Sequence, residues 1–523
     1  MNMVTFHLRF KTLAFVLYGI IAVWSGMALA ETELSGPATL SNGGEYYRLT
    51  QDISTNGTAF TITGNDITLD LNGHTVTYNT GSSGSGVVVS GSNNVVKNGI
   101  LIQGALRSGE ASGVYLGGSN NKAFNLAVKT NGIITGEQYS SCARPMGTNS
   151  EVYNIYCEST GTTNQMAYSP RCIMGENRGQ AGIKVHDNIL VGCHVGVSFD
   201  FLGLNTDMPD KTLIYNNLMQ HQRTPGTKAP FGVLLGKCRN VEIYGNTIIS
   251  DNGRGIMIDG YGQGVPRGTN YVTVHNNRVD VNYQVPATGG QYVENNVMGL
   301  YDRYSSGDNT FKSNIVIVDN EITDSSAAVR IGSDAPDGLM NNIVVEDNTL
   351  IAYRDTVFRW AVVDEVFVTN NRYFTNGGVH AFNWDGNQYN INIGDEIIES
   401  GTTEIIPVSY TPEAPTGLRL TRFFNSYLLR WDDNLDKGES QTYEYVIYRD
   451  GEKLPISPRG GTFYVDVDVG WGIHTYSISA LTLSGDESAR SLEVSTINAK
   501  NGWWDEEGSP NLPNPPSGLK LKN

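Results

Sequence analysis

The stretch Val241-Glu-Ile-Tyr-Gly-Asn246-Thr-Ile-Ile-Ser250 carries the pattern that decides the fold of this chain. Apolar residues alternate with polar ones, an asparagine follows, and a second apolar run comes after it. The asparagine recurs at Asn72, Asn98, Asn125, Asn154, Asn188, Asn217, Asn246, Asn277, Asn320, Asn348 and Asn371. Subtraction of these numbers gives intervals of 23 to 43 residues, and such a period indicates a solenoid, a propeller or an array.

Each repeat contains three short strands. Around Asn246 they are Val241–Tyr244, Thr247–Ser250 and Gly255–Asp259, and their apolar residues alternate with a period of two. Three strands per turn, stacked about 4.8 Å apart, predict an all-β, right-handed parallel β-helix. Most intervals are too short for propeller blades, which need about 40 residues. We expect the asparagines to occupy left-handed bends and to bond from coil to coil, with no catalytic role.

The first thirty residues predict a signal peptide. Arg9 and Lys11 form a basic flank, Leu13–Val23 an apolar segment, and Ala28-Leu29-Ala30 a small-residue cleavage site before Glu31. A membrane anchor is the competing interpretation, but the apolar segment is short and no second one follows. We therefore expect a secreted protein, extracellular or periplasmic, without a stable membrane anchor.

The repeat pattern ends near residue 410. The segments Ala414–Leu420, Tyr445–Gly451 and Tyr476–Ala480, together with Trp431, resemble a fibronectin type III module, which is a β-sandwich. The sequence thus predicts a signal peptide at 1–30, a β-helix domain at 31–410, a fibronectin type III-like domain at 411–498 and a tail or linker at 499–523.

Charge and cysteine content narrow the range of partners. The formal net charge of −17 argues against nucleic acid as a partner, because phosphates need a basic surface. It leaves room for an acidic polysaccharide bound along a local basic stripe. In an exported protein, Cys142, Cys157, Cys172, Cys193 and Cys238 predict one or two disulfides and an odd thiol. Their spacing does not suggest a zinc site.

The third strand of each coil follows the pattern Gly-apolar-x-apolar-x, so its x positions face outward in register. One outward column is expected to hold Tyr115, Ile134, Ser198, Leu234, Met257, Tyr301, Arg330 and Arg359. The neighbouring column is expected to hold Gly117, Gly136, Asp200, Gly236, Asp259 and Arg303. Asp200 and Asp259 would then lie two coils apart, about 9–10 Å. Lys237 follows the second column in the coil between them.

These columns predict a glycan-binding groove. Arg303, Arg330 and Arg359 fall on consecutive coils, where their guanidinium groups suit successive carboxylates or sulfates. Long insertions at 138–181, 261–270 and 282–298 flank the groove, and insertions beside a rigid scaffold often carry binding residues. Tyr261, Tyr292 and Tyr301 are expected to offer flat rings to sugars. The alternative is that the outward Arg and Asp residues form only a solvated, salt-bridged face.

The coil pattern, the asparagine column and Ile67-Thr-Leu-Asp-Leu-Asn-Gly-His74 together resemble the pectate-lyase-like superfamily of polysaccharide lyases, hydrolases and epimerases, over about residues 45–400. The resemblance implies a polysaccharide as substrate. It transfers no catalytic residue. The Arg-x-Pro-x-x-Arg motif of pectate lyases, the Asn-Thr-Asp, Asp-Asp and Gly-His-Gly set of polygalacturonases and the Asp-Pro-His motif of alginate epimerases are all absent from the sequence.

The resulting hypothesis is a monomeric polysaccharide lyase that cleaves an acidic, uronate-containing polysaccharide by β-elimination. Arg303 or Arg330 would neutralise the uronate carboxylate, and a desolvated Lys237 would be the base. Calcium held by Asp200 and Asp259 would assist, although two carboxylates are few for that ion. Two alternatives stay open. Asp200 and Asp259 would form the acid/base pair of an inverting hydrolase, or the chain is a non-catalytic glycan-binding or surface structural protein.

Overall fold

The computed structural model describes residues 31–104, 111–131, 140–159, 170–176, 180–200, 202–203, 209–222, 230–251, 253–259, 270–282, 296–302, 312–318, 321–324, 327–333, 340–352, 358–361, 366–375, 397–434, 444–456, 461–470 and 472–502. The predicted signal peptide and most of the predicted tail lie outside these residues. Within them, no helix is long and apolar enough to cross a membrane.

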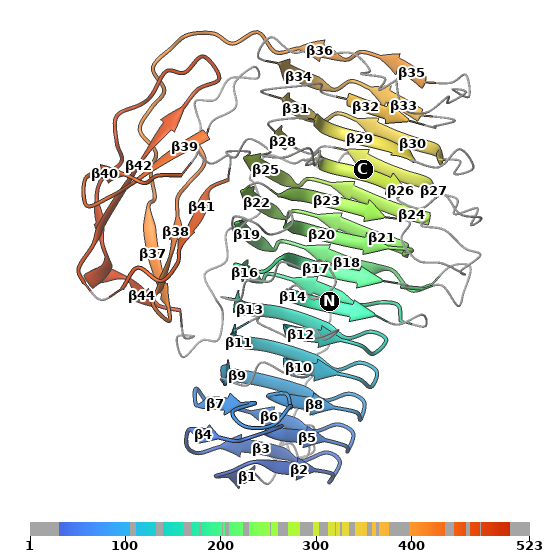
Figure 1. Ribbon diagram of the computed structural model, residues 1–523, viewed down its shortest axis with the longest axis vertical. Helices are drawn as coiled ribbons and strands as arrows, with labels where there is room; N and C mark the ends of the chain where they lie inside the picture. The colour runs from blue at the N-terminus through green and yellow to red at the C-terminus, as the bar shows by residue number, and fades with distance from the viewer. Residues whose placement is uncertain are drawn as a thin grey trace, which may run out of the picture.

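The described strands up to residue 404 form a parallel β-helix, which confirms the predicted fold class (Figure 1). One wall is a 12-stranded parallel sheet. Its strands are β2 (Ala38–Leu40), β5 (Phe60–Ile62), β8 (Val87–Val89), β10 (Ala111–Leu116), β12 (Ser140–Pro145), β14 (Arg171–Glu176), β17 (Val195–Asp200), β20 (Phe231–Gly236), β23 (Arg254–Asp259), β26 (Asn296–Asp302), β29 (Ala327–Ser333) and β32 (Phe358–Ala361).

The other walls belong to one 24-stranded sheet that bends between two rows of strands. The first row is β1 (Glu31–Leu34), β3 (Tyr46–Leu49), β6 (Thr68–Asp70), β9 (Val95–Gln103), β11 (Lys122–Thr130), β13 (Glu151–Ser159), β15 (Lys184–His186), β18 (Thr212–Tyr215), β21 (Arg239–Tyr244), β24 (Asn270–His275), β27 (Lys312–Val318), β30 (Met340–Glu346), β33 (Val366–Thr369) and β35 (Ile397–Ser400). The second row is β4 (Ile53–Ser54), β7 (Thr75–Tyr78), the carboxyl halves of β9, β11 and β13, then β16 (Ile189–Val191), β19 (Leu218–Gln222), β22 (Thr247–Asp251), β25 (Arg278–Asn282), β28 (Glu321–Asp324), β31 (Thr349–Ala352), β34 (Arg372–Thr375) and β36 (Thr403–Glu404).

Because side chains alternate along each strand, every second side chain points inward and fills the space between the walls. In β20 and β23, Val233, Leu235, Ile256 and Ile258 are fully buried and belong to one continuous apolar core. Three of the glycines in the predicted third strands, Gly113, Gly196 and Gly232, are required by this packing. A Cβ on Gly232 would lie 2.4 Å from Ile248 Cγ2, so no larger residue fits without displacing the core.

A ladder of buried asparagines runs along the bend between the two rows. The Nδ2 of Asn188 donates to Asn217 Oδ1 at 2.9 Å, Asn217 to Asn246 at 2.9 Å, and Asn246 to Asn277 at 2.9 Å. These side chains are at most 2% exposed. The expected coil-to-coil bonding is therefore present.

The prediction that each of these asparagines is itself left-handed is wrong for this ladder. The left-handed residue precedes it, as in Asp187 (φ 56°), Asn216 (φ 53°) and Asn276 (φ 54°). In earlier coils Asn125 and Asn154 do hold that conformation, with φ of 53° and 52°. The recurring asparagines of the sequence therefore occupy two neighbouring columns rather than one.

The strand register shows that the asparagine moves from one column to the other between two consecutive coils, those of Asn154 and Asn188. Tyr153 lies opposite His186, so Asn154 aligns with Asp187 and the inward position of Asn188 belongs to Ile155 in the earlier coil. An apolar residue there packs in the core, which leaves the asparagine on the bend itself.

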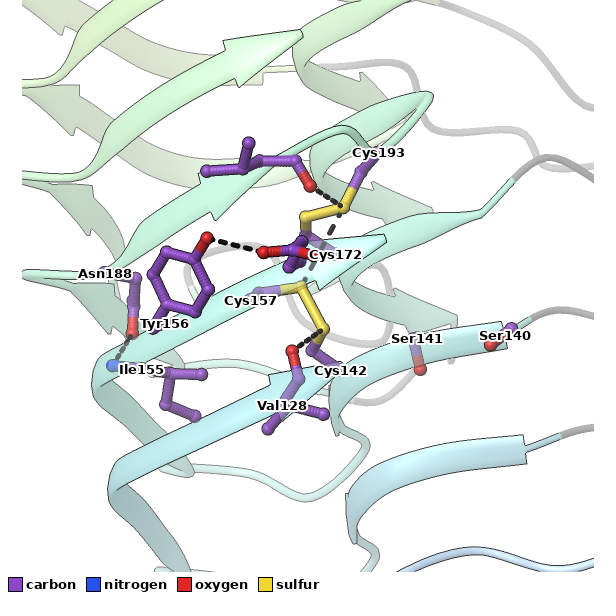
Figure 2. The surroundings of a disulfide bond; sticks show 12 residues. Val128, Ser140, Ser141, Cys142, Ile155, Tyr156, Cys157, Cys172, Asn188 and Cys193 are labelled. Atoms are coloured by element: carbon purple, nitrogen blue, oxygen red, sulfur yellow. Dashed lines mark hydrogen bonds between the residues drawn. A yellow bond between two sulfur atoms is a disulfide. The ribbon is translucent and has the colours of Figure 1, made fainter. Parts of the chain in front are cut away.

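Two disulfides lie inside the core, within the predicted number. They join Cys142 to Cys157 and Cys172 to Cys193, and all four side chains are at most 1% exposed. Figure 2 shows the two bridges side by side, with the sulfurs of Cys157 and Cys193 3.8 Å apart. Cys238 is buried and belongs to neither bridge, and its Sγ lies 3.4 Å from the Phe199 carbonyl oxygen.

Outside the first row, six rings stack in one column. Phe124, Tyr153, His186, Tyr215, Tyr244 and His275 have successive ring centroids 4.5–5.1 Å apart. His186 Nδ1 lies 2.7 Å from Asp187 Oδ2, and its Nε2 lies 3.2 Å from Glu151 Oε1. Burial lowers the pKa of His186, but the hydrogen bonds to Asp187 and Glu151 outweigh it and leave this pKa above its usual value. The His186 hydrogen bond works against burial and, with Lys122, lowers the pKa of Glu151 to about 2.

These shifts predict a falling stability above neutral pH. A raised folded-state pKa means that His186 stabilises the fold below its unfolded value of about 6.5 and loses that contribution as the pH rises through the folded value. Glu151 contributes above its unfolded pKa and loses its share only as the pH falls toward about 2. We expect the melting temperature to fall as the pH rises from about 6.5 through the raised folded-state pKa of His186, and to fall less in His186→Phe, which keeps a ring but cannot titrate. Equal falls in both proteins would contradict the assignment.

The C-terminal part is a β-sandwich of two four-stranded sheets, which lies alongside the β-helix (Figure 1). One sheet contains β41 (Phe463–Asp466), β38 (Ser426–Arg430), β37 (Arg419–Phe423) and β44 (Lys500–Asn501). The other contains β40 (Glu452–Lys453), β39 (Glu444–Arg449), β42 (Thr475–Leu481) and β43 (Val494–Ser495), followed by the 3₁₀ helix η2 (Thr496–Asn498). Its membership of the fibronectin type III class stays a prediction.

Candidate functional site

The strand register fixes where the predicted groove residues stand on the 12-stranded sheet. Asp200 lies opposite Gly236, and Gly236 lies opposite Asp259, so the two aspartates share a column two strands apart, as expected. Arg330 and Arg359 lie opposite each other on β29 and β32, also as expected.

The predicted phase of β26 is wrong. Tyr301 lies opposite Asp259, in the aspartate column, and Gly299 takes the place opposite Met257 that Tyr301 was expected to hold. The prediction depended on Gly299 as the glycine that opens the strand. The long insertion before this glycine lacks the repeat pattern, so the spacing did not reveal the correct phase of β26.

Several predicted residues cannot be placed in the site. Tyr261, Tyr292 and Arg303 lie outside the described residues, and only backbone positions are described for Asp259, Tyr301, Arg330 and Arg359. Lys237 stands at the bend after β20, with φ of 48° and no exposed surface. The roles assigned to these residues stay predictions.

The described polar side chains gather instead on four consecutive strands, β10, β12, β14 and β17. Arg171 on β14 is the centre. Its Nη1 donates to Ser198 Oγ at 2.9 Å and lies 3.4 Å from Glu176 Oε1 and 3.5 Å from Asp200 Oδ2. Glu176 and Asp200 lie directly opposite each other on β14 and β17. A guanidinium thus bridges two carboxylates across adjacent coils.

A second arginine extends this group by two strands. Arg144 on β12 lies opposite Tyr115 on β10, and its guanidinium carbon is 5.8 Å from the centroid of the tyrosine ring. Three residues earlier on the same two strands, the hydroxyl groups of Ser112 and Ser141 form a hydrogen bond of 3.0 Å, and Ser141 lies opposite Arg171. We call Tyr115, Arg144, Arg171, Glu176, Ser198 and Asp200 the site cluster.

The site cluster has a buried floor and a partly exposed rim. Arg144 is 5% exposed and Ser198 is fully buried. The side chains of Glu176 and Asp200 keep 30% and 20% of their surface exposed, against 10% for Arg171. Both carboxylates are therefore within reach of a ligand, over a largely buried cation.

The two carboxylates are also close enough to act together. Since each oxygen lies within 3.5 Å of the same Arg171 nitrogen, the oxygens are no more than about 7 Å apart. Paired carboxyl groups cleave glycosidic bonds at separations of about 5–5.5 Å with retention and about 6.5–9.5 Å with inversion. The limit is compatible with either geometry.

The sequence analysis missed three members of this cluster. It expected Ile134 and Gly136 in the outward columns and treated 138–181 as an insertion, but the strand opposite β10 is Ser140–Pro145, and Arg171–Glu176 follows in the next coil. Arg144 therefore occupies the column position assigned to Ile134. A usable signal existed, because each segment carries a cysteine followed by an apolar residue, and both cysteines lie in the core.

The site cluster does not present a calcium site. The Asp200 carboxylate already neighbours Arg171, and a second cation there would be repelled. Among the residues that the structure describes, the one group of three potential metal ligands is Cys157, Cys172 and Cys193, whose sulfurs are in disulfides.

Comparison with known proteins gives remote structural matches. No protein-family model matches the sequence, and no curated protein matches it. A PL6 family polysaccharide lyase from Pseudopedobacter saltans shows 13% identity over 72% of this chain and 92% of its own, with a TM-score of 0.43. The catalytic unit of a GH87 α-1,3-glucanase from Streptomyces thermodiastaticus shows 14% identity over 72% of this chain and 70% of its own, with a TM-score of 0.42.

A third match is partial. The spore cortex lytic enzyme SleM from Clostridium perfringens shows 24% identity over 16% of this chain, with a TM-score of 0.14. The aligned part spans 27% of that enzyme. These matches assign neither an activity nor a site to this chain.

Proposed function

We propose that this chain is a carbohydrate-active protein that binds an acidic polysaccharide along the outward face of the 12-stranded sheet and cleaves it at the site cluster. The observation that carries the proposal is the largely buried Arg171 guanidinium between the partly exposed carboxylates of Glu176 and Asp200, with the buried Arg144 on the neighbouring strand β12. A sheet of this kind presents the same face over many coils, which suits a linear polymer.

The first candidate reaction is β-elimination on a uronate. Arg144 would pair with the sugar carboxylate and so make the adjacent C–H bond more acidic. Asp200 or Glu176 would accept that proton, the electron pair would form the C=C bond, and the C–O bond to the leaving sugar would break. The hydroxyl of Tyr115, whose ring lies beside the Arg144 guanidinium, would supply a proton to the leaving oxygen.

The second candidate reaction is hydrolysis by the carboxylate pair. It is favoured by one observation, the limit of about 7 Å between Glu176 Oε1 and Asp200 Oδ2. One carboxyl group would protonate the glycosidic oxygen while the other acts on water or on the sugar carbon. Asp200 belongs to both candidate reactions, and its partner here is Glu176 rather than Asp259.

The deciding experiment incubates the mature chain with alginate, pectate and glycosaminoglycans. New ultraviolet absorbance from unsaturated uronate ends supports elimination, whereas reducing ends without that absorbance support hydrolysis. Binding without either product would reduce the chain to a glycan-binding protein. If it neither binds nor cleaves any anionic glycan, the proposal is wrong.

Two further parts of the proposal concern the whole chain. Residues 1–30 would direct export to the periplasm or the medium and would be removed in the process. Mass spectrometry of the exported chain would then show Glu31 at its N-terminus. We also expect a monomer, which light scattering would measure.

A further inference from the structure

Two neighbouring strands in one sheet of the C-terminal sandwich, β38 and β41, are buried on both of their faces. Every residue of β38 and β41 is buried. Tyr427, Leu429 and Tyr464 face the core between the two sandwich sheets. In an ordinary two-sheet sandwich, the alternate residues would face water. Here they are Leu428, Phe463 and Val465, which belong to a different apolar cluster together with Phe423.

The second cluster is completed by the β-helix. Its other members lie on the outward side of the second row, on successive coils: Ala127, Tyr156, Ile189, Val191, Leu218 and Ile249. The rings of Tyr156 and Phe423 stack with centroids 4.2 Å apart and an interplanar angle of 4°. We call this outward side the docking face. The sheet that contains β38 and β41 therefore lies between the other sheet of the sandwich and the docking face.

Gln220 at the docking face closes the edge of the sandwich sheet. Its Nε2 donates to the Val465 carbonyl at 2.7 Å, and its Oε1 accepts from the Val465 N–H at 2.8 Å. The amide therefore replaces a neighbouring strand for the edge strand β41. An edge strand covered in this way is not left open for pairing with other chains.

A buried carboxylate also links the two parts. Glu158 has no exposed surface, yet its Oε2 accepts hydrogen bonds from Ser426 Oγ at 3.0 Å and from the Tyr156 hydroxyl at 2.8 Å. Its Oε1 pairs with Lys129 Nζ at 2.5 Å, and the same ammonium lies 3.7 Å from Asp468. A buried charge is tolerated when it is paired and hydrogen-bonded, and here partners come from both parts of the chain.

From this interface we infer that the C-terminal sandwich is the permanent partner of the docking face, a fixed part of the β-helix wall rather than a spacer or a mobile binding module. The contacts between the described residues of the two parts use second-row residues, and the site cluster is on the 12-stranded sheet. The sandwich therefore leaves that face of the described structure open. This inference does not depend on the proposed function.

The test cuts the full chain between the two parts. Ile406 and Val408 are 73% and 57% exposed, so a protease site inserted there would be accessible. After cleavage, we expect both fragments to elute together in size-exclusion chromatography at low protein concentration. Separate elution of the wild-type fragments would overturn the inference.

Matched variants locate the interface. Leu428→Asp changes a residue outside the sandwich core, and Ile189→Asp makes the equivalent change on the β-helix side. Each is expected to separate the cleaved fragments, so the pair keeps the test decisive if one variant fails to fold. Leu492→Asp, at a position 90% exposed on the same sandwich, should leave them together. Co-elution of both folded interface variants would show that the fragments are held by some other surface.

Discussion

Replacing Arg144 with alanine is expected to lower the rate of cleavage of an acidic polysaccharide by about 10²–10³-fold, the usual cost of removing one preorganised group that stabilises developing charge. Arg144 is 5% exposed and is held beside the ring of Tyr115, so its guanidinium is already positioned before substrate arrives. The measurement is the initial rate of product formation under both subsaturating and saturating substrate, with the melting temperature recorded for each variant.

Two controls separate chemistry from folding. Arg144→Lys keeps the charge but loses the planar fork, and it should recover only part of the rate. Arg48→Ala removes an arginine whose side chain is 45% exposed on β3, far along the chain from the site cluster, and its rate should equal that of wild type. A fully active, normally folded Arg144→Ala protein would remove this residue from the mechanism.

Replacing Asn217 with alanine is expected to destabilise the β-helix by about 3–5 kcal/mol, because several buried groups lose their partners at once. Asn217 Oδ1 accepts from the backbone N–H and the Nδ2 of Asn188, and its own Nδ2 donates to the carbonyl oxygens of Val185 and Tyr215 and to Asn246 Oδ1. Alanine offers none of these bonds, and the vacated space is closed to bulk water. Denaturant unfolding of both proteins would measure the difference.

The neighbouring residue provides the matched control. Asn216 has a φ of 53°, a conformation that glycine adopts without strain, so Asn216→Gly should change stability by a few tenths of a kcal/mol at most. A loss of similar size in both variants would show that the bend, and not the amide ladder, is the stabilising element.

The repeat period was sufficient to predict the β-helix because coil length and side-chain alternation are local properties of the sequence. The phase of each coil was harder to predict. Asn154 and Asn188 look equivalent in the sequence, but one holds the left-handed bend and the other the inward position one residue later. A one-residue change of this kind leaves the repeat length almost unaltered, so spacing alone does not reveal it.

The candidate site was predicted only in part, for a related reason. Asp200 was placed correctly beside Gly236 and Asp259, since those coils are regular. Arg144, Arg171 and Glu176 were missed because their strands lie within a segment that lacks the repeat spacing. Their recognition required the pairing of β10, β12 and β14, which is a long-range property.

The sequence also carries a signal for the sandwich side of this interface. Tyr427-Leu-Leu429 and Phe463-Tyr-Val465 are continuous apolar runs, and such runs are typical of strands covered on both sides. A sandwich exposed to water would alternate at these positions. The runs therefore predict a third layer, but they do not say which surface supplies it.

The sandwich also changes how this solenoid should come apart. In a stack where each coil is held only by its neighbours, opening begins at the ends and proceeds coil by coil. The sandwich contacts six successive strands of the second row, from Ala127 on β11 to Arg278 on β25. The sandwich holds those coils together from the side. Opening that begins at either end of the β-helix is therefore expected to stop at these coils until the sandwich detaches. Slow hydrogen exchange should accordingly concentrate in the middle of the helix, where the site cluster lies.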